Sequence, residues 1–221
     1  DGQPVDGFMG ALPEGQVRAF LDKHLPSVEE VEADEAESEA LDALAEGDTA
    51  SALEHLQHAV ATDPANDEAR FDYVKLLLQL GREDDAKVAF APVIAKAAGS
   101  RRLGALKDWM DALDFVAASA YGESAGAEFD AKIAANKRDF EARFGRARWL
   151  MAQQRWTEAM DELLEILMRD KAWGEEAARK TYVSILEIIE PPKPKVAEGQ
   201  IPPEDPVVAT YRRRLSSVVL S

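Results

Sequence analysis

The sequence predicts an all-α fold, a stack of helical hairpins, and three observations support this prediction. Segments that begin at Gly47 and Gly81 carry matching residues at a constant separation of 34 positions. Apolar side chains recur at helical spacing through almost all of residues 27–190. Each of the two glycines also stands where one helix would end and the chain would reverse, a place for a left-handed residue. Because a hairpin can bury only one face, neighbouring hairpins are expected to stack and share a core.

The repeat holds at four positions. Besides the two glycines, the same separation relates Ala52 to Ala86, Leu56 to Phe90, and Ala59 to Val93. The alanines would allow two helices to approach closely, and the larger residues would fill the space between units. A proline, Pro64, then ends the second helix of the first copy. A period of 34 residues is that of the tetratricopeptide repeat, a helix–turn–helix unit, and this segment resembles such repeats.

A third copy is expected further along the chain. The letters EARF occur at Glu68–Phe71 and again at Glu141–Phe144, a shift of 73 residues. The same shift relates Leu77 to Leu150, Ala86 to Ala159, Phe90 to Leu163, and Val93 to Ile166. In this copy Gln154 replaces the glycine, so we predict turns near Gly47, Gly81 and Gln154. The extra length predicts an intervening helical pair, with candidates at Leu103–Ser119 and Ala127–Asn136 separated by the letters YGESAG.

The two ends of the chain differ from this repeated region. At the beginning, a short extended run from Val5 to Phe8 precedes a helix that starts near Glu14. That helix carries Val17, Phe20, Leu21 and Leu25 on one face. At the other end, a helix near Glu175–Glu190 is followed by a segment with five of the eleven prolines, which predicts an extended or flexible linker. Between these ends, residues 27–48 form a helix with ten acidic side chains and no basic one.

The final predicted helix is a candidate partner-binding element. Its residues Val207, Tyr211, Leu215, Val218 and Val219 recur at helical spacing and form an apolar face, which Arg212, Arg213 and Arg214 flank. Two interpretations remain open. The face can cover the last repeat as a cap, since terminal repeats need covering. It can also bind another protein as a helix in a groove.

Composition excludes several kinds of partner. The formal net charge is −16, which argues against nucleic acid and against anionic membrane surfaces, since both are bound by lysine and arginine. No apolar run approaches the roughly 20 residues that span a bilayer. The chain begins without a basic segment followed by an apolar one, so no secretion signal is expected. There is no cysteine, so these residues can carry out no thiol or disulfide chemistry.

No pattern of catalytic residues is found, and we predict that the chain is not an enzyme and holds no cofactor or metal. His55 and His58 lie three residues apart, but an exposed helix face explains them better than a metal site. Asp63, Asn66 and Asp67 resemble the start of a calcium loop but lack its glycine and its terminal glutamate. Phosphate-binding loops, nucleophile elbows and zinc-protease signatures are all missing from the sequence.

The order of the parts resembles one known family. Residues 1–26 are similar to the last strand and last helix of a thioredoxin fold, with Gly10 at the end of the strand. A thioredoxin end followed by tetratricopeptide-like repeats resembles the chaperedoxin family. The letters RKTYVSIL at Arg179–Leu186 and TYRRRL at Thr210–Leu215 resemble its C-terminal signature. The proline-rich linker is the main departure from the family.

This resemblance implies a bacterial cytoplasmic co-chaperone. Members of the family hold unfolding client proteins and pass them to the chaperonin GroEL or to the DnaK system. The family's redox chemistry cannot be carried over, since the matching motif positions are not in this sequence. The segment near Val207–Leu220 would correspond to the helix that contacts the chaperonin.

The repeats and the family resemblance together predict how the chain is divided. Residues 1–26 are the remnant of a thioredoxin-like domain, 27–190 the helical repeats, 191–206 the linker, and 207–221 the C-terminal helix. Two alternatives to a co-chaperone remain. One is a repeat scaffold that binds a defined peptide or protein, although the acidic first helix argues against a grip on acidic chaperone tails. The other is the helical appendage of a thioredoxin-like oxidoreductase.

Overall fold

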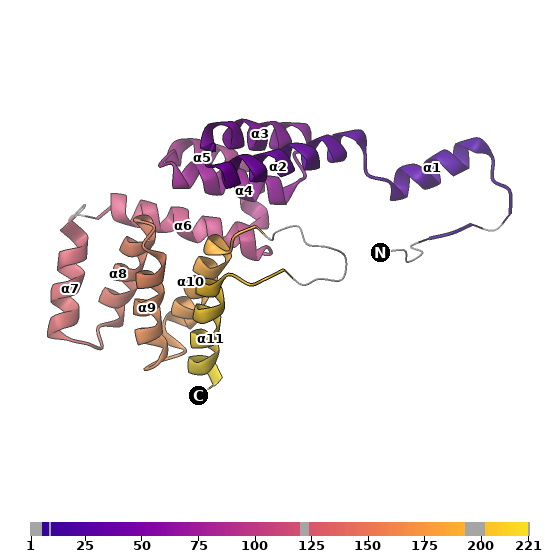
Figure 1. The fold of residues 1–221 in the computed structure, drawn as a ribbon. Coiled ribbons are helices and arrows are strands. Elements are labelled where there is room, and N and C mark those ends of the chain that lie inside the picture. Colours follow the sequence, from indigo (N-terminus) through magenta and orange to yellow (C-terminus); the bar gives the residue numbers. More distant parts are fainter. Residues whose placement is uncertain (1–5, 9, 120–123, 193–201, 221) are drawn as a thin grey trace. The chain divides into compact units, whose positions relative to one another are not determined.

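A computed structural model describes residues 6–8, 10–119, 124–192 and 202–220, and every regular element in these ranges is a helix (Figure 1). The helices are α1 (Glu14–His24), α2 (Val28–Glu46), α3 (Thr49–Thr62), α4 (Asp67–Gln79), α5 (Glu83–Phe90), the 3₁₀ helix η1 (Ala91–Lys96), α6 (Arg101–Ala117), α7 (Ala125–Ala135), α8 (Phe140–Ala152), α9 (Trp156–Leu167), α10 (Trp173–Ile189) and α11 (Pro206–Leu220). The all-α prediction is therefore confirmed for the repeats. By its internal contacts the chain divides into two compact units, Asp1–Asn66 and Asp67–Ser221, which we describe separately.

The predicted first strand is the part of the fold class that the structure does not support. Residues 6–8 and 10 are irregular, and no strand forms anywhere in the described ranges; Val5 and Met9 lie outside them. A strand needs a neighbouring strand to satisfy its backbone N–H and C=O groups, and these ranges supply none. The predicted helix after it is present as α1, but none of its side chains is buried.

In the first unit, α1 contacts the residues just before it. The Phe8 and Phe20 rings meet edge to face with centroids 5.2 Å apart. The Asp6 carboxylate accepts hydrogen bonds from Lys23 Nζ at 2.9 Å and lies 3.0 Å from His24 Nε2. These contacts hold the pKa of Asp6 far below its ordinary value, the Lys23 hydrogen bond being the largest cause.

Helices α2 and α3 form the first hairpin. A capping box begins α2, with Ser27 Oγ accepting from Glu30 N–H and Glu30 Oε2 accepting from Ser27 N–H. Gly47 ends it with φ 82°, and the next N–H donates to Ala43 O at 2.8 Å, as in a Schellman turn. The buried hydrophobic side chains of this hairpin are Ala33, Ala36, Ala40, Ala52, Leu56 and Ala59. The acidic helix and the close approach of alanines are thus as predicted.

The second unit begins with α4 and α5, which turn at Gly81. Its φ is 71°, and Arg82 N–H donates to Leu77 O at 2.9 Å, the same turn as at Gly47. The second copy departs from the first in one respect. Its second helix stops at Phe90 and continues as the 3₁₀ helix η1, because Pro92 has no N–H to donate to the preceding turn. Val93 is nevertheless buried, as the repeat predicts.

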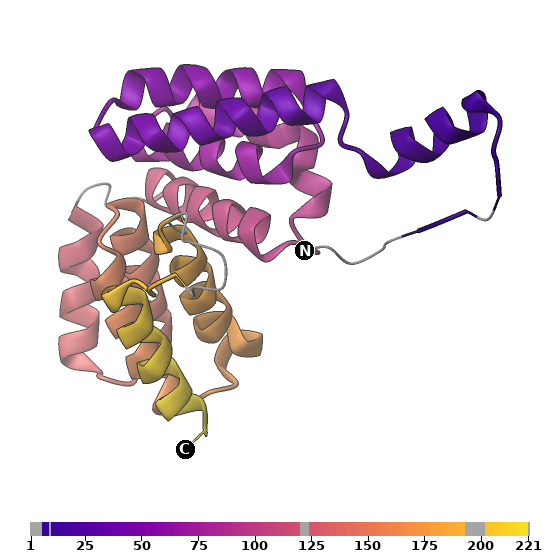
Figure 2. The ribbon, with the colours of Figure 1, turned by 45° about the vertical axis from the view of Figure 1, so that its right-hand side comes forward.

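Helices α8, α9, α10 and α11 lie side by side, and α6 packs against α8 and α10 (Figures 1 and 2). Together they enclose the main core. The largest side chains that are fully buried there or at its edge are Trp109, Leu150, Met151, Met160, Leu163, Ile166 and Tyr182. The third turn is at Gln154, which adopts φ 57°, and Arg155 N–H donates to Leu150 O at 2.9 Å. The three predicted turns are therefore confirmed, and the third uses a left-handed residue that is not glycine.

The two predicted intervening helices form as α6 and α7, and most of their contacts are with other helices. Helix α7 packs on α8, while α6 crosses to α8 and α10. Between α6 and α7 the Phe115 and Phe129 rings stack with centroids 6.2 Å apart. Two glycines explain the close approach of α7 to α8: a Cβ atom at Gly126 would lie 2.5 Å from the Trp149 ring, and one at Gly145 would lie 2.6 Å from the Phe129 ring. The first half of the predicted YGESAG loop falls outside the described residues, and its last two residues, Ala125 and Gly126, already belong to α7.

Two features complete the second unit. The first residues of α10 are not α-helical, because Gly174, Glu175 and Glu176 have φ between 56° and 64°. The regular part of the helix therefore begins after Glu176, close to the predicted start. The predicted linker lies mostly outside the described residues, at 193–201. Beyond it α11 is a regular helix, as predicted.

Candidate functional site

A groove between α6 and α10 is a concave feature of the second unit. It has a volume of about 670 Å³, and Ile94 of η1 and the turn Ala97–Ser100 also line it. The two helices run in opposite directions along it. Arg101, at the start of α6, lies near Glu187 towards the end of α10, while Asp108 and Ser184 meet further along. A groove between two helices offers room for a segment of another protein.

Small residues and one polar pair form the floor of this groove. Gly104 lies against the backbone, and a Cβ atom there would be 3.1 Å from Ala97 O. Ser184 Oγ donates to Asp108 Oδ2 at 2.6 Å. Burial raises the pKa of Asp108, and the hydrogen bond from Ser184 opposes part of that effect. The carboxylate is therefore partly withdrawn from water and faces the groove with one oxygen already bonded.

The edges of the groove carry four basic residues and one exposed acidic residue, Glu176. Arg101 and Lys107 belong to α6, and Arg179 and Lys180 belong to α10; all four are exposed. Two of them have close acidic neighbours on their own helix, Lys107 with Asp111 at 2.6 Å and Arg179 with Glu176 at 3.1 Å. Four basic residues on the edges of one groove stand out in a chain with 42 acidic and 26 basic residues.

The predicted partner-binding helix, α11, is docked on its own repeats. Val208 is fully buried in the core formed by α8, α9 and α10, and Tyr211, Leu215 and Val218 pack against that core. Tyr182 Oη, from α10, donates to Tyr211 O at 2.8 Å. Burial raises the pKa of Tyr182 above its ordinary range. Most of the apolar face thus acts as the cap that the first interpretation describes.

The arginines of α11 divide into two groups. Arg212 pairs with Glu190 and Glu204, both at 2.7 Å, and Arg214 pairs with Asp161 at 2.6 Å. Their acidic partners therefore lie on this protein. The Arg213 side chain instead donates a hydrogen bond to Thr210 Oγ1, on the same helix, at 3.3 Å.

Of the predicted site residues, four are exposed, and one of these, Arg214, is paired with Asp161. The other three are Val207, Arg213 and Val219, which lie at different angles around the helix. Leu220, which the prediction did not include among its site residues, is 86% exposed. The structure thus separates the eight predicted residues into five that pack or pair within the protein and three that stay exposed.

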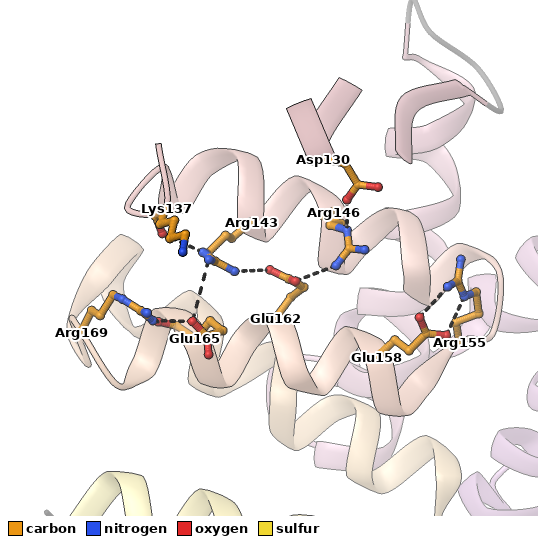
Figure 3. Close-up of polar contacts among 9 residues, drawn as sticks. All are labelled: Asp130, Lys137, Arg143, Arg146, Arg155, Glu158, Glu162, Glu165 and Arg169. Atoms are coloured by element: carbon orange, nitrogen blue, oxygen red, sulfur yellow. Dashed lines mark hydrogen bonds and ion pairs between the residues drawn. The ribbon is translucent and has the colours of Figure 1, made fainter. Parts of the chain in front are cut away.

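A second polar cluster, on α7, α8 and α9, is structural (Figure 3). Arg143 and Arg146 both donate to Glu162, each at 2.6 Å, and Arg143 Nε also donates to Lys137 O. Arg146 Nε lies 2.6 Å from Asp130 Oδ1, an ion pair without the angle of a hydrogen bond. The Arg143 and Glu162 side chains are only 7% and 13% exposed, so this cluster joins helices and leaves little for a ligand to contact.

The histidines of α3 do not come together around a metal. His55 Nδ1 lies 3.0 Å from Glu39 and His58 Nε2 lies 3.1 Å from Glu32, so each pairs with a separate carboxylate on α2. No group of three or more metal-ligating side chains occurs among the residues that the structure describes. None of the helices in those ranges is both long and apolar enough to span a bilayer.

The groove between α6 and α10 was not predicted from the sequence. Its signal is the spacing of Arg179 and Lys180 with Val183 and Ser184, which places basic and small residues on one face of α10. That signal is incomplete, because the opposite wall comes from α6, more than 70 residues earlier. Only the packing of α6 against α10 brings the two walls together.

Comparison with known protein families supports the repeat architecture. Two family models, both described as tetratricopeptide repeat, match the chain, one over residues 43–109 and the other over residues 119–219. The first includes the copies that turn at Gly47 and Gly81, and the second includes the copy that turns at Gln154. No curated protein matches the chain in a sequence search.

Proposed function

Because the chain is a TPR-like protein of helical repeats, we propose that its function is to bind other proteins rather than to catalyse a reaction. The observation that best supports this proposal is the groove between α6 and α10, which is open to solvent, has charged edges and a floor of small residues, and is large enough for a peptide segment. Stacked helical hairpins commonly present such surfaces to extended or helical partners.

The specific form that we propose is a co-chaperone of the bacterial cytoplasm. It holds unfolding client proteins and passes them to the chaperonin GroEL or to the DnaK system. The resemblance to the chaperedoxin family supports this proposal, through the order of the parts and the segments Arg179–Leu186 and Thr210–Leu215. The net charge of −16 supports it as well, because repulsion between like charges would keep complexes with an aggregation-prone client in solution.

The holding activity is tested by light scattering. Citrate synthase is heated with a several-fold molar excess of the chain, without ATP, and we expect aggregation to be slowed. An equal mass of an unrelated acidic protein serves as the control for net charge. Aggregation that proceeds as fast as with the control would contradict the proposal of a client-holding protein.

A scaffold that binds one defined partner is the second candidate, and the charge pattern of the groove favours it. A protein that holds many unrelated clients has no use for a fixed arrangement of four basic residues. A single defined partner can place acidic residues opposite them. Affinity capture followed by mass spectrometry separates the two candidates. Many unrelated unfolding proteins indicate a holdase, and one stoichiometric partner indicates a scaffold.

The proposed contact with GroEL involves α11. Since most of its apolar face is docked, we propose that the chaperonin either contacts exposed residues of the docked helix, Arg213 among them, or displaces the helix. Deletion of residues 207–221 should abolish capture by GroEL under either alternative. Arg213→Glu should weaken capture only if the docked helix is contacted, more at low salt than at high salt. Capture that is unchanged by the deletion would show that α11 is only a cap.

A further inference from the structure

We propose that the groove between α6 and α10 binds an internal acidic segment of a partner protein, held by the basic edges and seated on the small-residue floor. This inference rests on the proposed protein-binding function and names the chemistry of the partner. It concerns a surface distinct from α11 and does not require a free C-terminal carboxylate on the partner.

The dimensions of the groove define the length of the segment. From Arg179 to Glu187 the groove follows α10 for eight residues, or about 12 Å at 1.5 Å per residue. That distance is matched by about four residues of extended chain or by about two turns of helix. Val183 lies midway along this stretch and offers an apolar contact, next to the bare backbone at Gly104.

The charges on the edges are available to a partner. Arg101 is 82% exposed, and its nearest acidic group, Glu187, is 3.7 Å away and only 17% exposed. Lys180 is exposed and makes no ion pair within the described residues. Two cations from opposite walls therefore face the groove without strong internal neutralisation, although the chain as a whole is strongly acidic. An incoming carboxylate would meet them at little cost, because neither cation has to leave a tight ion pair.

The floor explains why the partner should be acidic at its edges rather than along its whole length. Asp108 and Glu187 are the acidic residues of the floor, and both are partly buried. They would repel a carboxylate that is pushed deep into the groove. The unbonded oxygen of Asp108 can instead accept a backbone N–H from the partner. The occupant that fits is a segment with small or apolar residues in the centre and acidic residues on both flanks.

The test uses two fluorescein-labelled peptides and the full chain. The acidic probe is fluorescein-GEDELALAEDE-amide, with the dye on the N-terminal amine, and the neutral probe is fluorescein-GQNQLALAQNQ-amide. Fluorescence anisotropy at low salt should show saturable binding of the acidic probe and at least about tenfold weaker binding of the neutral one. Because both probes are amidated, a requirement for a terminal carboxylate would appear as failure of the acidic probe, and that result would overturn the proposal.

Charge-reversal variants locate the binding. The double variant Arg101→Glu/Lys180→Glu removes one cation from each wall and should weaken binding of the acidic probe about tenfold or more. The matched control is Lys132→Glu/Arg138→Glu, which changes the net charge equally at exposed positions on and just after α7. It should weaken binding by less than about twofold, since distant charges are screened. Circular dichroism verifies that both variants are folded.

Besides failure of the acidic probe, three results would overturn the proposal. Equal binding of the two probes would show that charge plays no part, and equal weakening by both variants would show a net-charge effect without a site. Self-association of the chain in sedimentation experiments, abolished by the groove variant, would show that the occupant is a second copy. If the probe fails to bind while the chain still slows aggregation of citrate synthase, only this inference fails and the proposed function stands.

Discussion

At the scale of single residues, the three turns make a matched set. Gly47, Gly81 and Gln154 occupy equivalent left-handed positions, with φ of 82°, 71° and 57°, and the residue after each donates a hydrogen bond five residues back. The left-handed conformation destabilises a residue with a Cβ atom by about 1–2 kcal/mol, and it destabilises glycine hardly at all. The third turn is therefore the strained one.

The first prediction exchanges these residues. Gln154→Gly should raise the free energy of unfolding by about 1 kcal/mol, and Gly81→Gln should lower it by about as much. Urea unfolding followed by circular dichroism measures both changes. Gln153→Gly is the control: Gln153 has φ −94°, so glycine brings no conformational gain there and should be neutral or destabilising. Stabilisation by the control as large as that by Gln154→Gly would contradict the explanation.

The second prediction, also at the residue scale, concerns pH. Burial raises the pKa of Asp108, so the folded state holds its proton at a pH where the unfolded chain has lost it. This group therefore favours folding at low pH, and that contribution is lost as the pH rises through its folded pKa. Asp108→Asn should be more stable than the parent chain at neutral pH, and the difference should shrink as the pH falls towards the ordinary value for aspartate. Thermal melts of both chains over this range measure it, and a constant difference would contradict the assignment.

At the scale of elements, α11 shows how a terminal helix completes a repeat stack. Val208 fills a site in the core of the second unit, while its neighbour Val207 is 45% exposed. The pairs of Arg212 and Arg214 with Glu190 and Asp161 lie at the surface. Exposed ion pairs contribute at most about 1 kcal/mol each, so burial of apolar side chains accounts for most of the docking.

The third prediction uses these two neighbouring valines. Val208→Ala should destabilise the second unit by about 2 kcal/mol, since it removes fully buried methyl groups. Val207→Ala, at the neighbouring exposed position, should change the free energy of unfolding by less than about 0.5 kcal/mol. Chemical denaturation measures the effect, and limited proteolysis between residues 190 and 206 should become faster only for Val208→Ala. Similar effects of the two substitutions would show that α11 is not docked in solution.

At the scale of the whole molecule, the two compact units differ in how much they can stabilise themselves. The second unit holds the large buried side chains, among them Trp109, Leu163 and Tyr182. Within the described part of the first unit, five of the six buried hydrophobic residues are alanines, and Leu56 is the sixth. Alanine removes little apolar surface from water, so a two-helix hairpin with this core has a small driving force for folding.

The fourth prediction follows from this contrast. A fragment of residues 67–221 should be helical and should melt cooperatively on its own. A fragment of residues 1–66 should lose most of its helicity and show no cooperative transition, and raising the salt concentration should recover part of it by screening the acidic residues of α2. Circular dichroism of both fragments is the measurement. A cooperative transition in the shorter fragment would mean that contacts of alanine alone are sufficient.

The sequence by itself determined the helical class, the 34-residue period and the positions of the turns. These properties follow from local chemistry: helical spacing of apolar residues, the left-handed preference of glycine, and the helix-ending effect of proline. For α11 it left capping and partner binding open. It placed Tyr211, Leu215 and Val218 correctly on the apolar face, but it did not include Val208, the buried residue of the helix. The described residues before α1 do not support the predicted strand, since a strand depends on a partner that local sequence does not contain.

Only the tertiary structure decided how the helices between the repeats are used. The sequence predicted that the segments now seen as α6 and α7 are two helices, but it did not indicate their packing partners. Helix α7 packs on α8 through Gly126 and Gly145, and α6 packs on α10. That second contact creates the groove. Its basic edges come from Arg101 and Lys180, which are 79 positions apart in the sequence, so no local pattern joins them. Side-chain packing between distant helices sets which charges face each other, and the candidate site therefore exists only in the folded chain.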